Sequence, residues 1–242
     1  MAAFTGQVAV ITGASSGIGK AIALGLAAQG AALCLIGRRC EALEAVAQQA
    51  RPLVPCVRQY LADLTLDHAL EALTAQLRRD IGRLDLLVHS AGAITLGRIE
   101  TAPVADFDWQ YRTNVRAPYV LTQALLPMLR ASRGQIVFIN SSIVLTPHPN
   151  ASQYAATKHA LKAVADSLRA EVNADGLRVL SVYPGRTASP MQALEHQCEG
   201  RAYRPERLLQ PEDVAAAVTN ALRLPRTAEV TDLHIRPLLK PL

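Results

Sequence analysis

The sequence predicts an α/β fold in which a doubly wound parallel sheet carries helices on both faces, giving three α/β/α layers. Short apolar segments alternate with segments of helical spacing along all 242 residues. The apolar segments are hydrophobic throughout, as expected of parallel strands buried on both faces. A glycine-rich turn follows the first of them, "QVAVIT" at 7–12. We find no linker, repeat or low-complexity tract, so we expect one domain over residues 1–242.

Seven strands are expected, at 7–12, 31–36, 54–60, 84–90, 134–142, 177–184 and 229–235. Helices are expected at 20–30, 40–50, 66–81, 103–130, 152–174 and 211–223. Within the long segment 103–130 we expect Pro118 and Pro127 to bend or break the helix. The segment 186–210 has the weakest periodicity and follows a strand end, so we expect it to form a substrate-binding lid.

The composition fits a protein with a large aliphatic core, because 50% of the residues are hydrophobic and only 4% are aromatic. The formal charge is +5 and the pI is about 9.2. The basic residues are scattered and form no block of like charge, so we do not expect a nucleic-acid-binding tail. Local basic residues would suit a phosphorylated cofactor.

The cysteines and the absence of targeting patterns favour a cytoplasmic protein. The four cysteines, Cys34, Cys40, Cys56 and Cys198, form no CxxC pair, and no histidine cluster has metal-ligand spacing. We therefore expect no metal site and reduced thiols. No secretory signal opens the chain and no run of about 18 apolar residues could span a bilayer, so no membrane contact is expected.

The turn after the first strand, "TGASSGIGK" at 12–20, predicts a phosphate-binding site. Glycines at 13, 17 and 19 would let the backbone approach a pyrophosphate, and the following helix would present free N–H groups and its positive dipole end. The spacing GxxxGxG differs from the P-loop, since Ala21 follows Lys20, and from the common dinucleotide fingerprint GxGxxG. A turn that only packs the helix on the strand is the alternative.

Two arginines follow the second strand, where a site selective for NAD usually carries an acidic residue for the ribose 2′-hydroxyl. This chain has Arg38 and Arg39 there. Arginine attracts a 2′-phosphate and can grip it in a fork, which favours NADP(H) over NAD(H). Alternatively, both arginines only begin a solvated helix.

The stretch "YAATK" predicts a proton-transfer site, because Tyr154 and Lys158 share a helix face. An ammonium beside a phenol favours the phenolate, so we expect Lys158 to lower the pKa of Tyr154. The serines Ser141 and Ser142 stand at the end of the preceding strand, where open α/β sheets bind ligands. Together these groups would polarise a carbonyl while a nicotinamide delivers hydride.

These motifs resemble the short-chain dehydrogenase/reductase family, in its compact single-domain Rossmann form, over nearly the whole chain. The resemblance implies Tyr154 as acid/base, Lys158 as its partner at the nicotinamide ribose, Ser141 at the substrate oxygen and Asn114 anchoring a proton-relay water. Ser141 is preferred to Ser142 because it stands thirteen positions before Tyr154. The implied cofactor-binding residues are Gly13, Ser15, Ser16, Gly17, Ile18, Gly19, Arg38, Arg39, Asp63, Leu64, Ser90, Ala91, Gly92, Tyr154, Lys158, Pro184, Gly185 and Thr187, with Ser189 as the alternative to Thr187.

The chain departs from the family pattern at "HSAG", where His89 and Ser90 replace the asparagines of NNAG. Ser90 can still donate and accept hydrogen bonds. We expect His89 to be a strand-end histidine bonded to backbone rather than a catalytic group.

The favoured function is an NADP(H)-dependent oxidoreductase acting on a carbonyl or secondary alcohol. A catalytically idle nucleotide-binding regulator, or an epimerase or dehydratase on the same fold, is the alternative. The substrate stays open, because the charges of the expected lid are balanced and Met191 and Leu194 predict a partly apolar wall. The resemblance also implies a homodimer or homotetramer that pairs through the helices of Asn114 and Tyr154.

Overall fold

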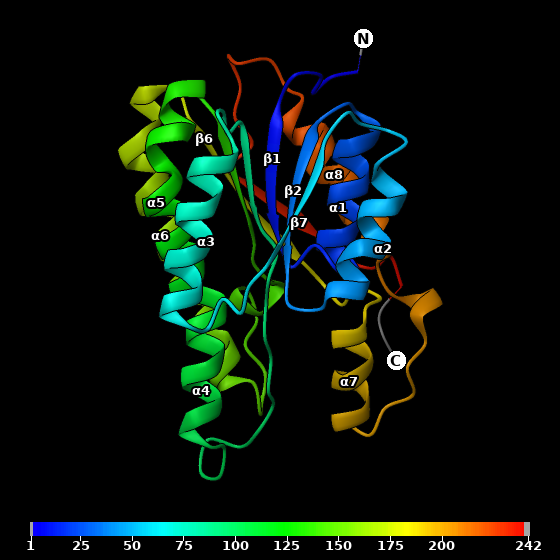
Figure 1. Cartoon of the computed structure of the whole chain (residues 1–242). Coiled ribbons are helices and arrows are strands. Elements are labelled where there is room, and N and C mark those ends of the chain that lie inside the picture. Colours follow the sequence, from blue (N-terminus) through cyan, green and yellow to red (C-terminus); the bar gives the residue numbers. More distant parts are fainter. Residues whose placement is uncertain (1, 240–242) are drawn as a thin grey trace.

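The computed structural model describes residues 2–239 as a seven-stranded, all-parallel sheet between two layers of helices (Figure 1). The strand order is β3-β2-β1-β4-β5-β6-β7. The chain therefore winds outward from β1 in one direction and from β4 in the other, and the order reverses between these two strands. In such a sheet, ligands bind at the reversal point, beyond the carboxyl ends of the strands.

The predicted alternation of strands and helices is confirmed. The strands are β1 (Val8–Thr12), β2 (Ala32–Gly37), β3 (Val57–Leu61), β4 (Leu86–His89), β5 (Gln135–Ile139), β6 (Arg178–Pro184) and β7 (Asp232–Ile235). The α-helices are α1 (Gly17–Ala28), α2 (Cys40–Ala50), α3 (Asp67–Asp80), α4 (Val104–Tyr111), α5 (Ala117–Ser132), α6 (Ser152–Val172), α7 (Pro190–Cys198) and α8 (Pro211–Leu222). Short helical turns are η1 (Arg112–Arg116), η2 (Ser142–Val144), η3 (Asn173–Asp175) and η4 (Pro205–Arg207).

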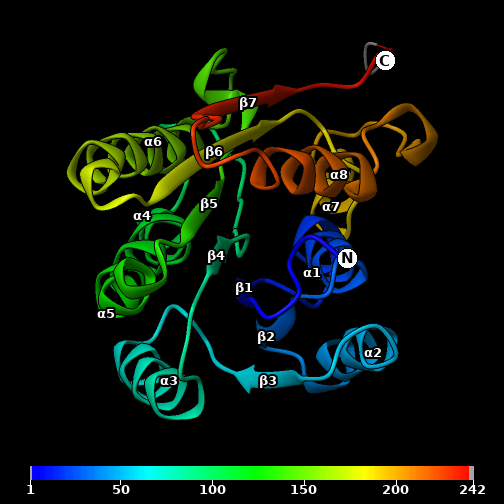
Figure 2. The ribbon, with the colours of Figure 1, turned by 90° about the horizontal axis from the view of Figure 1, so that it is seen from above.

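Each face of the sheet is covered by its own apolar cluster, which explains why the central strands are hydrophobic throughout. Ile11 and Val137 belong to the cluster beneath α1, α2 and α8, whereas Val10 and Phe138 belong to the one beneath α3, α5 and α6. Neighbouring strand residues thus point to opposite faces and both are buried. Seen along the sheet, the two helical layers lie on opposite sides of the twisted strands (Figure 2).

The expected helix over 103–130 is divided just before Pro118 but not at Pro127. A π-helical turn, η1, separates α4 from α5 and ends two residues before Pro118, which has no N–H to bond back to that turn. Pro127 lies inside α5 without ending it, so the helix does not break there. The π turn carries Asn114, and such turns are frequent at functional sites.

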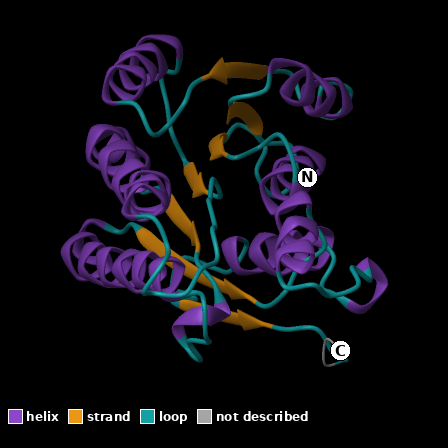
Figure 3. Cartoon of the chain, turned by 90° about the horizontal axis from the view of Figure 1, so that it is seen from below, coloured by secondary structure: helices purple, strands orange, loops and turns teal. Residues whose placement is uncertain are grey.

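Two helices extend past the carboxyl ends of the strands and flank the space beyond them (Figure 1). One is α4, and the other is α7, from the segment 186–210. A bridge that pairs Thr187 with Leu209 holds the two ends of that segment side by side. The same strand ends face the viewer when the protein is seen from below (Figure 3). Between residues 2 and 239, no helix is both long and apolar enough to cross a membrane.

Candidate active site

A cavity of about 860 Å³ opens beyond the carboxyl ends of the strands. It is lined by the turn after β1, the end of β2, the segments after β3, β4 and β5, the start of α6 and the segment after β6. Every predicted site residue lines it except Asn114. Residues from positions 13 to 236 therefore meet in one site, as the strand-end rule predicts.

The glycine turn takes the shape needed for close backbone approach. Gly13 has φ 66° and Gly17 has φ 52°, a left-handed conformation that favours glycine. A Cβ on Gly13 would lie 2.7 Å from the backbone nitrogen of Ala91, so any larger residue would push the two turns apart. The Thr12 hydroxyl joins the same turns by accepting hydrogen bonds from the N–H groups of Ser90 and Ala91, both at 3.1 Å.

Two arginines line the outer end of the cavity and give it positive charge. Arg38 and Arg39 are exposed, line the cavity, and have no ion-pair partner in the described chain. They stand where β2 passes into the N-terminus of α2, an end that itself favours negative charge. This arrangement fits a negatively charged phosphate group.

Asp63 follows β3 and also lines the cavity. Its Oδ1 accepts hydrogen bonds from the Thr65 N–H at 2.9 Å and the Thr65 hydroxyl at 2.8 Å. Burial favours the neutral acid, but these hydrogen bonds and the charge of Arg38 outweigh it and lower the pKa of Asp63. The carboxylate is therefore ionised and held in place, and its second oxygen is available to a ligand.

At the inner end, Tyr154 and Lys158 lie on α6 and Ser141 lies just past β5. The Ser141 side chain, not that of Ser142, hydrogen-bonds the Tyr154 phenol. Lys158 is buried, its Nζ donates to the backbone oxygen of Ile139 at 3.0 Å, and the ammonium lies 5.7 Å from the centre of the Tyr154 ring. Three groups able to hold or move a proton thus meet at one place.

The predicted lowering of the Tyr154 pKa by Lys158 is not found in the protein alone. Burial raises the pKa of Tyr154 above its usual range, the hydrogen bond from Ser141 opposes this rise, and the negative charge of Glu195 adds to it. Burial also lowers the pKa of Lys158, to about 8. The expectation failed because it considered only the neighbouring charge and left out the cost of burying a phenolate.

Asn114 lies behind the cavity wall rather than in it. Its amide exchanges two 2.8 Å hydrogen bonds with the backbone of Ala93 and donates a third, at 3.0 Å, to the Thr157 hydroxyl. The side chain therefore joins η1 to the segment after β4 and to α6, between Tyr154 and Lys158. These contacts make it a candidate positioning residue, and its role in anchoring a relay water stays a prediction.

Asn140 also lines the cavity and is not among the site residues predicted from the sequence. Its Oδ1 accepts from the Ser141 N–H at 2.9 Å, and its Nδ2 donates to the backbone oxygen of Lys158 at 3.1 Å. The buried amide thus connects Ser141 with the turn of α6 that carries Lys158. The only available signal was a buried-strand asparagine directly before two serines.

Comparison with known proteins decides the family. Residues 7–199 match the family model described as short chain dehydrogenase. The chain belongs to the short-chain dehydrogenase family. It is 34% identical over 238 residues to an uncharacterized oxidoreductase of Staphylococcus epidermidis, covering 98% of this chain and all of that protein. It is also 35% identical to an uncharacterized short-chain type dehydrogenase/reductase of Sinorhizobium fredii, covering 96% and 91%.

Solved short-chain dehydrogenase structures superpose over almost the entire chain. An alcohol dehydrogenase from the archaeon Thermococcus sibiricus, complexed with 5-hydroxy-NADP, has a TM-score of 0.87 and 28% identity, covering 98% of this chain and 99% of its own. A metagenomic short-chain oxidoreductase in complex with NADP has a TM-score of 0.85 and 30% identity. These matches support an NAD(P)-dependent oxidoreductase with the Rossmann-like fold.

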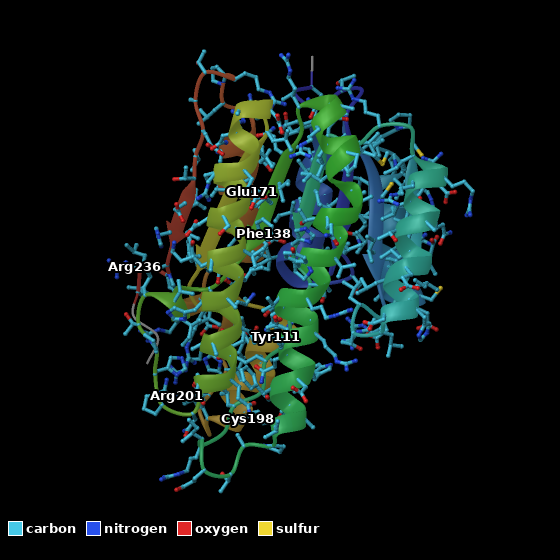
Figure 4. All side chains as sticks on the ribbon, turned by 90° about the vertical axis from the view of Figure 1, so that its left-hand side faces the viewer. Tyr111, Phe138, Glu171, Cys198, Arg201 and Arg236 are labelled. Atoms are coloured by element: carbon cyan, nitrogen blue, oxygen red, sulfur yellow. The ribbon has the colours of Figure 1, made fainter. Side chains whose placement is uncertain are left out.

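The departure from the family pattern at "HSAG" is structural in this short-chain dehydrogenase. His89 is 2% exposed, stacks on Phe138 with ring centroids 4.9 Å apart, and lies 2.9 Å through Nε2 from the Thr122 hydroxyl. The expected backbone partner is therefore replaced by a side chain. Burial lowers the pKa of His89 to about 3, so the imidazole is neutral and lies outside the cavity. Phe138, the stacking partner of His89, lies well above the segment 186–210 (Figure 4).

Thr187 and Ser189, after β6, both line the cavity, and each hydroxyl already takes part in one hydrogen bond. The Thr187 hydroxyl is buried and donates to the backbone oxygen of Gly185 at 2.9 Å. Ser189 caps α7, and its Cβ lies 3.4 Å from the position that a Cβ on Gly17 would take. Ser189 therefore faces the glycine turn of this short-chain dehydrogenase across the cavity.

Only part of the expected lid lines the cavity. Met191 does, but Leu194 points outward and is 63% exposed, so the prediction that both form an apolar wall was half wrong. Trp109 of α4 and Arg236, which follows β7, also line the cavity and were not predicted. Arg236 projects from the edge of the sheet about halfway down the protein (Figure 4).

Proposed function

We propose that this short-chain dehydrogenase transfers hydride between NADP(H) and a carbonyl or secondary alcohol, with Tyr154 as the acid/base. The observation that carries the proposal is the distribution of groups along one cavity. Unpaired arginines line one end, and the Ser141, Tyr154 and Lys158 side chains line the other. The cofactor supplies the hydride; the chain supplies binding, orientation and the proton.

The residues fit a phosphorylated dinucleotide. Because Gly13 has no side chain and lies close to Ala91, the surface beside the N-terminus of α1 is formed by backbone. Such a surface suits a pyrophosphate. Arg38 and Arg39 would hold a ribose 2′-phosphate, which supports NADP(H) over NAD(H). Lys158 would hold the nicotinamide ribose, while its own ammonium is anchored on the Ile139 carbonyl.

At the reacting end, the Ser141 hydroxyl and the Tyr154 phenol would both contact the substrate oxygen. Because burial raises the pKa of Tyr154, the phenol keeps its proton at neutral pH. This suits Tyr154 to act as the acid that protonates the oxygen of a carbonyl when the reaction runs as a reduction. Asn114 and Asn140 keep η1, Ser141 and α6 in register around this pair.

NADPH oxidation with a panel of ketones and aldehydes tests this function. We expect turnover with at least one member of the panel, and a lower KM for NADPH than for NADH. Tight NADPH binding without turnover on any carbonyl would instead support the nucleotide-binding regulator. The three-group constellation at Tyr154 argues against that alternative.

We also propose that the protein is a cytoplasmic homodimer or homotetramer. The exposed aromatic side chains Phe107, Tyr111 and Tyr119 lie on α4 and α5, the face through which the family resemblance implies pairing. Tyr111 projects from α4 beside α6 (Figure 4). Light scattering coupled to size exclusion would show a mass of two or four chains; a monomer at micromolar concentration would contradict the proposal.

A further inference from the structure

The lid presents a single acidic side chain to the catalytic end of the cavity. Of the acids and bases in 186–210, only Arg186 and Glu195 line the cavity. Glu195 lies on α7 one turn after Met191, so the two share a helix face. Met191 reaches over the segment after β4, with its methyl carbon 3.8 Å from the position that a Cβ on Gly92 would take. That face of α7 therefore looks into the site, and Glu195 with it.

The positive charge nearest to Glu195 is already neutralised. Arg186 Nη2 lies 2.6 Å from Glu199 Oε1, and both side chains are largely buried. Arg201 also approaches Glu199, at 3.5 Å, but it is more than half exposed and does not line the cavity. It lies at the outer end of the lid, next to Cys198 (Figure 4). Charges so exposed are screened by water and salt.

Glu195 itself has no hydrogen bond and no ion pair with any residue in 2–239. It is half-buried, and burial raises its pKa, while Arg186 and His148 act in the opposite direction. A half-buried carboxylate without a partner is costly, and a cation in the cavity would relieve that cost. The charge of Glu195 is also felt at Tyr154, so such a cation would sit close to the reacting group.

The opposite wall of the cavity suits the same ligand. Trp109 of α4 lines the cavity and is 37% exposed. An indole face attracts an ammonium group, and the carboxylate of Glu195 would pair with it. A substrate that carries a carboxylate of its own would be repelled by Glu195.

We infer that Glu195 is a specificity-determining residue that selects carbonyl substrates, or the corresponding alcohols, carrying a protonated amine. This inference rests on the proposed function, since it assumes that a carbonyl is reduced at Tyr154. Glu195 pairs with the ammonium, and Tyr154 and Ser141 hold the carbonyl oxygen. For a substrate without an amine, Tyr154 and Ser141 would hold the carbonyl oxygen in the same way.

The test compares three ketones of similar size: phenacylamine, 2-hydroxyacetophenone and benzoylformate, which carry an ammonium, a hydroxyl and a carboxylate. With NADPH saturating, we expect kcat/KM to be highest for phenacylamine and lowest for benzoylformate. Glu195→Gln should reduce kcat/KM for phenacylamine about tenfold, because the hydrogen bond between the carboxylate and the ammonium group would lose its charge assistance. Its kcat/KM for 2-hydroxyacetophenone should not fall. Glu206→Gln, an exposed acid of the same segment outside the cavity, is the control and should leave all three values unchanged.

A failure of this inference can be distinguished from a failure of the proposed function. If neutral ketones are reduced but phenacylamine is not preferred, or if the preference survives in Glu195→Gln, the inference is wrong and the proposed function stands. If no ketone is reduced, the proposed function is wrong, and calorimetry with benzylammonium and benzyl alcohol decides on Glu195. Benzylammonium binding that is lost in Glu195→Gln supports a cation site; equal binding of both ligands, or binding unaffected by the substitution, overturns it.

Discussion

The Asn140 side chain donates to the backbone oxygen of Lys158 at 3.1 Å while accepting from the N–H of Ser141 at 2.9 Å. One buried amide therefore sets the distance between the end of β5 and the catalytic turn of α6. Asn140→Ala would leave the Ser141 N–H without its partner and remove a second hydrogen bond to the Lys158 carbonyl, so we expect a stability loss of about 1–3 kcal/mol. It should also lower kcat, because Ser141 and Tyr154 would lose their alignment.

Asn173→Ala is the matched control for Asn140. Asn173 also bonds backbone through its side chain, donating to Leu177 O at 2.9 Å, but it lies after α6 and away from the cavity. We expect it to lose stability and keep kcat. Thermal unfolding and kcat at saturating substrate measure the two effects. If Asn140→Ala kept the wild-type kcat, its positioning role would be refuted.

Tyr154→Phe removes the proton donor and keeps the ring. We expect kcat to fall by about 10²–10⁴-fold, the usual contribution of a positioned acid. NADPH affinity, measured by fluorescence titration, should stay close to wild type. Tyr111→Phe, on the exposed face of α4, should change neither quantity. Near-wild-type turnover in Tyr154→Phe would contradict the mechanism.

Replacing both Arg38 and Arg39 with alanine should weaken NADPH far more than NADH. A hydrogen bond to a charged phosphate contributes about 1.5–3 kcal/mol, or about tenfold or more in affinity per arginine. The measurement is Kd for each cofactor in the double variant and in Arg58→Ala, an exposed arginine of β3 that does not line the cavity. An equal loss for both cofactors would mean that the arginines do not read the 2′-phosphate.

The pH dependence of kcat/KM should follow the ionisation of Lys158. Burial lowers its pKa to about 8 in the free protein, so the ammonium is charged below that pH and is lost as pH rises through it. Because kcat/KM reports groups of the free enzyme, we expect kcat/KM to decline above about pH 8. Lys158→Arg, which stays charged, should move the decline of any remaining activity to higher pH. A profile flat to pH 10 in the wild type would exclude this role.

His89 should make the fold sensitive to acid. Its pKa is about 3 in the folded protein and 6.5 ordinarily, so below pH 6.5 the unfolded chain binds a proton that the folded chain does not. Stability therefore falls as pH drops from 6.5 toward 3, by about 1.4 kcal/mol at pH 5.5. Urea unfolding of His89→Asn at pH 7.5 and 5.5 should show a smaller difference than wild type, and His68→Asn, in α3, should not. An unchanged difference in His89→Asn would show that His89 is not the group responsible.

Most of the fold follows from local patterns. The helix predicted over 40–50 is α2, with the same bounds, because its spacing of apolar residues and its flanking strands leave no other arrangement. The division of 103–130 could not be predicted. It depends on η1, whose Asn114 is held by Ala93 and Thr157, residues that are remote in sequence.

The candidate site, like the fold, could be predicted only in part from the sequence. Spacing alone was enough to place the glycine turn, Arg38, Arg39, Tyr154 and Lys158 at strand ends or on one helix face, since these positions follow from the periods of strand and helix. The tertiary structure decided the rest. It shows which serine meets Tyr154, that burial outweighs Lys158 in setting the Tyr154 pKa, and that Glu195, alone among the lid acids, faces the cavity. Burial and charge pairing depend on segments that meet only when the chain is folded, so no local pattern encodes them.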